Sequence, residues 1–478
     1  ITADSDLHLI FLPACYTISM LYNLCLKGIR HHIEHSFSKS LFYSIFRSEP
    51  CKHIRINSPR SDMCDTCDLL KSTLISIAHK HKEGEEVPLP PTELIDHLSL
   101  AHAAREDYRA DQKKAHKKEI SHFSFDYSQN LALPQKADQP GSFYFFSLRN
   151  IYLFGITDES CNHQMNYLID ESQCAKGSNE VISMISHFLS SLPKEKRAHI
   201  IFNADNCVGQ NKNNTMIKFF LWQCLIGNSK TIEVKFMIKG HTHFGPDSHF
   251  GYIKKRYRRS DVFSVEDLKT IIQASSTTNK ATILDHANFF DFKAGLKPYF
   301  KDLQGITNYH YFLFKDSLPG IVSVKKHLND PWTEHHLTKK TVNISDLRTN
   351  NSFKPSLLVA PGIALEKQID LYKKVRKYVP DEFKDVLCPK PPDYTADCTC
   401  TRSPNKSKKA DTPAVPTSKS KRRKASKGEL KLLNELYSKT PYPNRHVLID
   451  IADEMNWTID RVKIWFNNRR YKSKTIGG

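Results

Sequence analysis

Apolar and polar residues alternate along the middle of this 478-residue chain in patterns that predict strands and helices in turn. The strand-like runs lie at residues 122–128, 141–158, 165–170, 198–206 and 231–240. Between them, apolar residues recur at helical spacing from Asn179 to Leu192 and from Asn214 to Ile226. Such alternation is typical of a mixed sheet with flanking helices. We therefore predict an α/β body for the larger, N-terminal part of the chain.

The C-terminal end of the chain carries a purely helical pattern. A first helix starts near Ser426 and places Leu433 on its apolar face. A loop with two prolines ends this helix, and a second helix follows with Ile451 on its apolar face. The third helix runs from Thr458, which suits a helix cap, to about Lys474. Three short helices with one apolar face each bury a common core, so we predict an all-α three-helix domain.

The third of these helices has two faces of contrasting chemistry. One face is apolar and comprises Val462, Trp465 and Phe466. The neighbouring face holds Ile464, Asn467, Asn468 and Tyr471. Basic residues flank this second face: Arg461, Lys463, Arg469, Arg470, Lys472 and Lys474. Because phosphate contacts need cations on either side of the residues that read bases, the layout is typical of a DNA recognition helix.

The segment RVKIWFNNRRYKSK resembles the third-helix signature of homeodomains, with Trp465, Phe466, Asn468 and Arg470 at its most diagnostic positions. The similarity spans about 418–477. It implies a helix-turn-helix domain that binds double-stranded DNA in the nucleus and acts in transcription regulation.

The resemblance also implies a role for each residue of the recognition helix. Asn468 would bind adenine through N6 and N7, and Ile464 would contact a thymine methyl group. Asn467 and Tyr471 would tune the remaining bases. Arg470 and Lys472 would contact the DNA, and Arg422 with Arg423 would enter the minor groove from the preceding arm.

Charge is concentrated at the same end of the chain. The formal net charge is +19, and residues 401–478 account for +12 of it. The segment before the three helices is rich in Ser, Pro, Thr and Lys and lacks large apolar residues, so we predict a flexible basic linker. This asymmetry indicates a polyanionic partner, nucleic acid first.

These patterns predict six regions along the chain. They are a helical region at 1–50, a Cys/His-containing helical region at 51–122, an α/β core at 123–275, the C-terminal part of the body at 276–395, the linker at 396–424 and the three-helix domain at 425–478. The apolar stretch from Leu7 to Leu26 is interrupted by polar residues, so we expect a core helix and no membrane contact. The chain begins at Ile1, and we therefore expect a fragment or a trimmed N-terminus.

Three aspartates lie within or next to predicted elements of the body. Asp126 lies in the first strand, Asp205 ends the strand that includes Ala204, and Asp247 opens a helix after the strand 232–238. Three carboxylates brought together in this way would hold a pair of Mg²⁺ ions for phosphodiester chemistry. Single aspartates at strand ends also serve as caps or turn residues. We favour the metal site, because residues 205–214 hold more amides and lysine than a structural loop needs and 240–251 place three histidines around an acid.

The motifs DNCVGQNKNN at 205–214 and GHTHFGPDSHFG at 240–251 resemble those of an RNase H-like domain found in transposase-derived proteins. The similarity includes PRSDMCDTC, FDYSQNLALP and VLCPKPP, and therefore covers most of 40–392. It implies an RNase H-like sheet with Asp126, Asp205 and Asp247 as catalytic residues. His241 and His243 are competing candidates for the third position.

A second metal site is predicted upstream of the first strand. Cys64 and Cys67 have zinc-knuckle spacing, and His97 and His102 follow on a charged helix, so these four residues form a candidate structural Zn²⁺ site. Cys51 and His53 are alternative partners, and reduced surface thiols are the alternative to any metal. The twelve cysteines are scattered, which is typical of a reducing compartment rather than of a disulfide-stabilised secreted domain.

Two functions follow from these observations. The first is a transposase or integrase-like nuclease that uses a homeodomain to find its DNA. The second is a DNA-binding transcriptional regulator without catalysis, in which the body serves as an interaction or homodimerisation scaffold. They differ in whether the acids support metal-dependent cleavage.

Overall fold

The computed structural model describes residues 10–12, 14–29, 37–48, 51–56, 64–80, 91–349, 353–392, 427–440, 443, 445–455, 457, 461–466 and 469. The chain divides into two compact units between Cys398 and Thr399. The first unit contains the body and the second contains the C-terminal helices.

The body begins with a helical region. Its elements are β1 (Ile10–Leu12), α1 (Ile18–Ile29), α2 (Lys39–Arg47), β2 (Ile54–Ile56), α3 (Asp65–Lys80) and α4 (Thr92–His116). Strands β1 and β2 pair in parallel as a small separate sheet. Among the described residues, no helix combines the length and the apolar character needed to cross a bilayer.

A large mixed sheet forms the centre of the body, as predicted. Its strands are β3 (Ser121–Tyr127), β4 (Leu131–Leu133), β5 (Arg149–Asp158), β6 (His163–Asp170), β7 (His199–Ala204), β8 (Thr231–Phe236), β9 (Asn279–Ile283), β10 (Tyr311–Lys315), β11 (Ile321–Lys325) and β12 (Thr333–His336). Their order is β12-β11-β10-β8-β7-β3-β5-β6-β9, and β4 pairs with β5. The sequence pattern predicted that the α/β core ends at residue 275. The sheet continues beyond this residue, because β9 is added at one edge and β10, β11 and β12 at the other.

Strand directions divide the sheet into two halves. β3, β5 and β6 form an antiparallel meander, whereas β7 and β8 run parallel to β3. Helix α5 (Ser178–Ser191) and the short α6 (Lys194–Ala198) precede β7, and α7 (Asn214–Leu225) connects β7 with β8. The carboxyl ends of β3, β7 and β8 therefore lie at one edge of the sheet.

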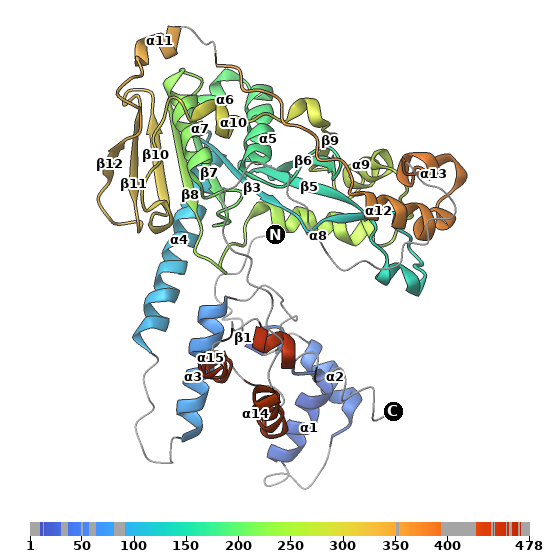
Figure 1. Cartoon of the computed structure of the whole chain (residues 1–478). Coiled ribbons are helices and arrows are strands. Elements are labelled where there is room, and N and C mark those ends of the chain that lie inside the picture. Colours follow the sequence, from blue (N-terminus) through green and yellow to red (C-terminus); the bar gives the residue numbers. More distant parts are fainter. Residues whose placement is uncertain are drawn as a thin grey trace. The chain divides into compact units, whose positions relative to one another are not determined.

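Helices cover both faces of this sheet (Figure 1). The remaining helices are α8 (Gly245–Tyr257), α9 (Val265–Gln273), α10 (Phe292–Leu296), α11 (Ile344–Thr349), α12 (Leu365–Asp370) and α13 (Asp381–Leu387). Short turns of tighter or wider helix are η2 (Gly141–Phe145), η3 (His286–Asn288), η4 (Ile306–Asn308), η5 (Leu371–Val375) and η6 (Arg376–Tyr378). The predicted strand at 141–158 therefore starts only at Arg149, because Gly141–Phe145 form a single turn that buries Phe143.

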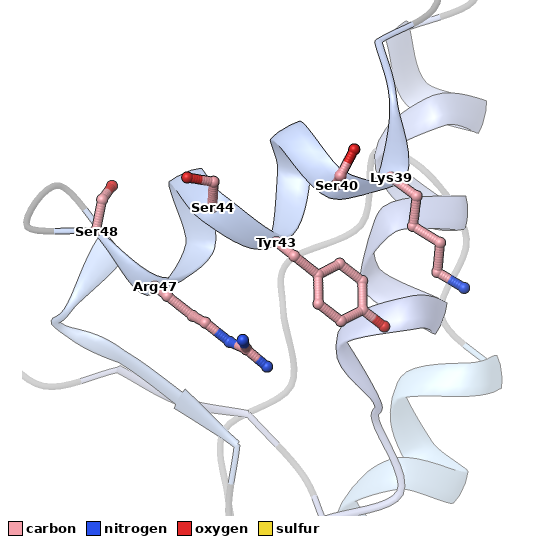
Figure 2. A pocket seen from close by; sticks show the side chains of 6 residues that line it. All are labelled: Lys39, Ser40, Tyr43, Ser44, Arg47 and Ser48. Atoms are coloured by element: carbon pink, nitrogen blue, oxygen red, sulfur yellow. The ribbon is translucent and has the colours of Figure 1, made fainter.

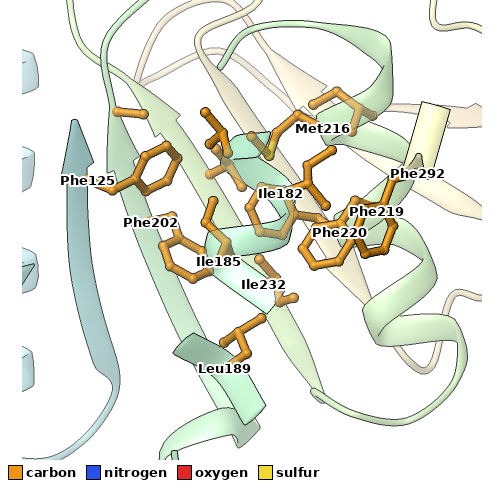
Figure 3. Packing of buried hydrophobic residues seen from close by; sticks show 14 of the residues in the cluster. Phe125, Ile182, Ile185, Leu189, Phe202, Met216, Phe219, Phe220, Ile232 and Phe292 are labelled. Carbon is orange, nitrogen blue, oxygen red and sulfur yellow. The ribbon is translucent and has the colours of Figure 1, made fainter. Parts of the chain in front are cut away.

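Apolar and polar side chains alternate along β3, so the two faces of the sheet differ in character at this strand. Phe123 and Phe125 are fully buried in the main hydrophobic cluster, together with residues of α5 and α7 such as Ile182 and Phe220. Figure 3 shows this packing around Phe125 and Phe202. Because side chains alternate along a strand, His122, Ser124 and Asp126 share the opposite face. The polar positions of β3 therefore face away from the apolar core.

Helix α8 covers that opposite face. Asp126 pairs with Gly155 on β5, and a Cβ at Gly155 would approach Phe250 of α8 to 2.9 Å. A Cβ at Gly245, the first residue of α8, would approach Thr157 of β5 to 2.8 Å. Glycine at these two positions lets the start of α8 lie close to the sheet on the side of Asp126.

The second unit contains α14 (Lys427–Lys439), α15 (Arg445–Glu454) and a further helical segment at 461–466. Its core is formed by residues from all three segments: Leu433, Leu448, Ile451, Ala452, Met455, Val462 and Phe466. The aromatic rings of Tyr437 and Phe466 lie 5.9 Å apart. The apolar faces predicted for three helices thus pack against one another as expected.

Candidate functional site

Asp126 lies on β3, and Asp205 directly follows the adjacent parallel strand β7. The register of β3 and β7 pairs Ser121 with Ile200 and Ser124 with Asn203. Continued by two residues, the same register places Asp126 beside Asp205, which directly follows β7. The sheet therefore brings together two carboxylates that are far apart in the sequence.

Asp247 approaches the pair from the first turn of α8. Its Oδ2 accepts a hydrogen bond of 3.2 Å from the backbone N–H of Phe244, so it also caps the helix. This capping is the ordinary structural use of an aspartate at that position. His243, the competing candidate, is largely exposed, and its Nδ1 lies 3.9 Å from Asp247 Oδ2.

The electrostatics of Asp126 show that the three acids act on one another. Burial, together with the negative charges of Asp205 and Asp247, raises the pKa of Asp126 to about 7. A backbone hydrogen bond from Tyr127 and the charge of Lys176 act in the opposite direction. The ionised form of Asp126 is therefore unfavourable in the metal-free protein, and a bound cation would stabilise it.

Polar side chains around Asp205 mostly hold the loop itself together. Asp205 Oδ1 accepts hydrogen bonds from the backbone of Cys207 at 3.1 Å and from Asn211 Nδ2 at 2.5 Å. Lys212 donates to Asn206 and to the carbonyl of Thr307, and Asn213 caps α7. The inference that a structural loop would not need these groups was therefore wrong for four of the amides and for the lysine, because Asn206, Asn211, Asn213, Asn214 and Lys212 all have structural partners.

Lys176 is a residue near the acids that sequence reasoning missed. Its ammonium group lies 4.3 Å from the ring centroid of Tyr127 and donates to Asn130 Oδ1 at 3.0 Å. Burial lowers the pKa of Lys176, and the charge of Asp126 opposes this effect. No local motif marks this lysine, since it lies in the loop between β6 and α5 and reaches the acids only through the fold.

A Cys-His cluster forms a second candidate site in the body. Its members are Cys64, Cys67, His97 and His241, whose potential ligand atoms all lie within 4.8 Å of one another. The structure thus brings three of the four predicted zinc ligands together and replaces the fourth. His102 is exposed on α4, and Cys51 and His53 are not in the cluster. His241 belongs to this cluster, not to the carboxylates, because its Nε2 lies 3.1 Å from His97 Nε2.

The third histidine of the 240–251 segment has a structural role. His249 is buried, and its ring nitrogens contact Asn279 Oδ1 at 2.9 Å and Asn162 Oδ1 at 3.2 Å. Burial lowers its pKa. His249 therefore packs α8 against β9 and against the turn between β5 and β6.

Two hollows accompany these sites. One of about 500 Å³ is lined by Asp247, His243, Glu159 and Tyr108, among others, and opens beside the first turn of α8. Another lies along α2, where Figure 2 shows Lys39 and Arg47 on either side of Tyr43. Both cations lie within 6 Å of that ring centroid, at 5.9 and 5.7 Å. This second hollow contains none of the acids or cluster residues.

Of the residues to which the homeodomain resemblance assigned a DNA contact, only Ile464 is among the described residues. Its side chain is 59% exposed, whereas Val462 and Phe466 beside it are buried, as a reading face requires. The others lie outside the described residues: Arg422, Arg423, Asn467, Asn468, Arg470, Tyr471 and Lys472.

Comparisons with known proteins identify the second unit. The homeodomain family matches residues 419–475, so the C-terminal end of the chain is a homeodomain. Homeobox protein Wariai of Dictyostelium discoideum is 37% identical over 59 residues, which are 12% of this chain and 7% of that protein. The chain therefore matches only a small part of this curated relative. Within the body, a family described as a domain of unknown function, DUF7869, matches residues 149–330.

Proposed function

We propose that this chain binds a specific sequence of double-stranded DNA through its homeodomain and cuts or joins DNA at the carboxylates of its body. The observation that carries the catalytic part is that the charges of Asp205, which directly follows β7, and of Asp247 both act on Asp126 of the adjacent parallel strand β3. Such a protein would work in the nucleus, as a transposase or integrase-like enzyme.

The topology of the sheet supports an RNase H-like body. In chain order, β3, β5 and β6 form an antiparallel meander, and β7 and β8 then add to β3 in parallel. The first strand therefore lies in the middle, next to the fourth, as in an RNase H-like sheet. The same arrangement supports the proposed site, because β3, which contains Asp126, pairs with β7, which Asp205 follows.

The donor set fits Mg²⁺. Asp126, Asp205 and Asp247 offer only carboxylate oxygens, which hard cations prefer. When bound, Mg²⁺ would stabilise the charge on the attacking and leaving oxygens of a phosphodiester. Asn211 would hold Asp205 in place through its hydrogen bond to Oδ1, and Lys176 would attract phosphate toward the acids.

DNA recognition is tested on the third helix of the homeodomain. Asn468→Ala should weaken binding by about 1–3 kcal/mol and relax selectivity at one base pair, because an amide reads adenine with two hydrogen bonds. Lys472→Ala should weaken binding to all sequences alike and reduce the salt slope by about one unit. Both effects are measured by titration of selected and scrambled duplexes at several salt concentrations. Unchanged affinity of Asn468→Ala at physiological salt would contradict the proposed readout.

Metal binding at the acids should depend on pH through Asp126. In the folded, metal-free protein the carboxyl group of Asp126 stays protonated up to about pH 7. Mn²⁺ must displace this proton, so Mn²⁺ affinity should fall about tenfold for each pH unit below about 7 and level off above it. The stability of the metal-free protein should depend on pH in the opposite direction to Mn²⁺ affinity. An unfolded chain loses this proton near pH 4, so between about pH 4 and 7 the stability of the folded state should fall as pH rises.

Calorimetric titration of Mn²⁺ at a series of pH values checks the first trend, and thermal unfolding without metal checks the second. Asp126→Asn is the control, because it has no proton to lose and should flatten both curves. A pH-independent Mn²⁺ affinity in the wild type would contradict the assignment of Asp126 as a ligand.

A further inference from the structure

We propose that Cys64, Cys67, His97 and His241 bind one Zn²⁺ ion, which fastens α3 and α4 to the loop between β8 and α8. The four residues come from three separate parts of the body. Cys64 and Cys67 lie at the start of α3, His97 lies on α4, and His241 lies in the loop that leads into α8. The site is a Cys₂His₂ centre, a common ligand set of structural zinc.

The spacing of the donor atoms fits a tetrahedral ion. Cys64 Sγ lies 3.2 Å from His97 Nε2, and Cys67 Sγ lies 3.4 Å from His241 Nε2. The two Nε2 atoms are 3.1 Å apart. Tetrahedral zinc with ordinary bond lengths separates neighbouring sulfur and nitrogen ligands by about 3.3–3.8 Å, so the cluster is within a few tenths of an ångström of that geometry.

The backbone around the cluster is shaped for close approach. Gly240 has φ +77°, and a Cβ at this position would approach the Cα of Cys64 to 2.6 Å. A side chain at 240 would therefore push His241 away from the two cysteines. Arg105 of α4 donates to the backbone carbonyls of His241 and His243, at 3.0 Å in the first case. These contacts hold the β8–α8 loop against α4 at the point where the ligands converge.

The chemistry of the cluster favours a metal over a redox pair. The two thiols are buried, whereas reactive dithiols need access to their partners. The two histidines both direct Nε2 into the cluster, and in the neutral tautomer that is protonated at Nδ1 this nitrogen offers a lone pair to a cation. Four such groups without an ion would leave several donors and acceptors facing one another.

The position of the site gives the ion a second role, which rests on the proposed function. Asp247 follows His241 by six residues and lies in the first turn of α8. Fixing His241 to α3 and α4 therefore restrains the start of α8 and with it the third carboxylate. We expect the zinc ion to order the acid site without taking part in its chemistry.

The first test measures zinc in the purified full-length chain by mass spectrometry. Wild type and His102→Ala should retain about one zinc ion per chain after dialysis, and His241→Ala and Cys64→Ser should lose it. His102 is a matched control, because it is a histidine on the same helix, outside the cluster. Co²⁺ substitution of the wild type should give the visible bands of a tetrahedral ion and a thiolate charge-transfer band. Retention of zinc in His241→Ala would overturn the assignment.

The second test uses wild-type protein and so does not depend on whether a variant folds. Thiol alkylation followed by peptide mass spectrometry should label Cys64 and Cys67 only after zinc is removed with a chelator. Cys174 and Cys224, which are also buried, should stay unlabelled in both conditions and report an intact core. Equal labelling of Cys64 and Cys67 with and without chelator, or their recovery as a disulfide, would overturn the proposal.

The role in ordering Asp247 has its own measurement. Mn²⁺ affinity at the acids should be about tenfold lower in His241→Ala than in His102→Ala, the size of effect expected when support for a ligand is lost. If zinc binds as proposed and Mn²⁺ affinity is equal in the two variants, the ordering role is wrong. If the wild type binds zinc but no Mn²⁺, the proposed catalytic function fails and the zinc site stands.

Discussion

Asp205→Asn should abolish metal-dependent cleavage of duplex DNA while sequence-specific binding stays unchanged. The substitution keeps the size of the side chain and the Oδ1 acceptor that contacts Asn211, but it removes the charge that a divalent ion needs. Loss of a residue that only supports a metal ligand costs about 10–100-fold, so loss of the ligand itself should lower the cleavage rate by at least about 100-fold. The measurement is nicking or strand transfer on a duplex that carries the homeodomain target, with Mg²⁺ and with Mn²⁺.

A matched control separates a specific effect from a general loss of charge. Asp138 is an exposed aspartate of the loop between β4 and η2, so Asp138→Asn should cleave like the wild type. Equal cleavage by wild type and Asp205→Asn would exclude the catalytic proposal. It would favour the second function, a DNA-binding regulator whose body is an interaction scaffold.

Lys235→Met should lower the free energy of unfolding of the body by about 3–5 kcal/mol, because it removes the nearest counterion of Asp107 and of the buried Asp111. Lys235 of β8 is 6% exposed and donates to Asp107 at 2.8 Å and to Asp111 at 2.5 Å, both on α4. Burial by itself would lower the pKa of Lys235, but the charges of Glu233, Asp111 and Asp107 outweigh it and hold the pKa above its ordinary value. Urea denaturation measures the loss, and hydrogen exchange in α4 shows where it acts.

An exposed ion pair is the reference for this prediction. Lys374 contacts Asp370 at 2.9 Å with both side chains partly in water, so Lys374→Met should cost less than about 1 kcal/mol. Adding Asp107→Leu and Asp111→Leu to Lys235→Met should recover most of the lost stability, since a buried charge cluster can be replaced by apolar packing. Similar losses in Lys235→Met and Lys374→Met would show that the ion cluster does not hold α4 to the sheet.

Short-range patterns account for what the sequence predicted well. In HFSFDY, apolar and polar residues alternate, which places Phe123 and Phe125 on one face of the strand and Asp126 on the other. The two-residue period is a property of any strand, whatever its position in a sheet. In the homeodomain, Val462 and Phe466 lie one turn apart and are buried, while Ile464 between them is exposed. Both patterns depend only on the geometry of one element, so they can be read without knowledge of the fold.

Loop chemistry was harder to interpret from the sequence. The amides of residues 205–214 suggested a reactive loop, but Asn206, Asn211 and Asn213 bond to the loop, the sheet and the start of α7. Amide side chains satisfy backbone groups and bind ligands with the same atoms, so their number does not distinguish the two uses. Only the positions of their partners do.

By itself, the sequence determined the two kinds of domain, the faces of their helices and strands, and the candidates Asp126, Asp205, Cys64 and Cys67. The tertiary structure decided which of these residues meet. It placed Asp126 level with Asp205 through strand register, and it completed the cysteine cluster with His241, which is 144 residues from His97, instead of with His102 on the same helix. The reason is that periodicity encodes the face on which a side chain lies, whereas contacts between distant segments depend on strand order and loop paths that no local spacing records.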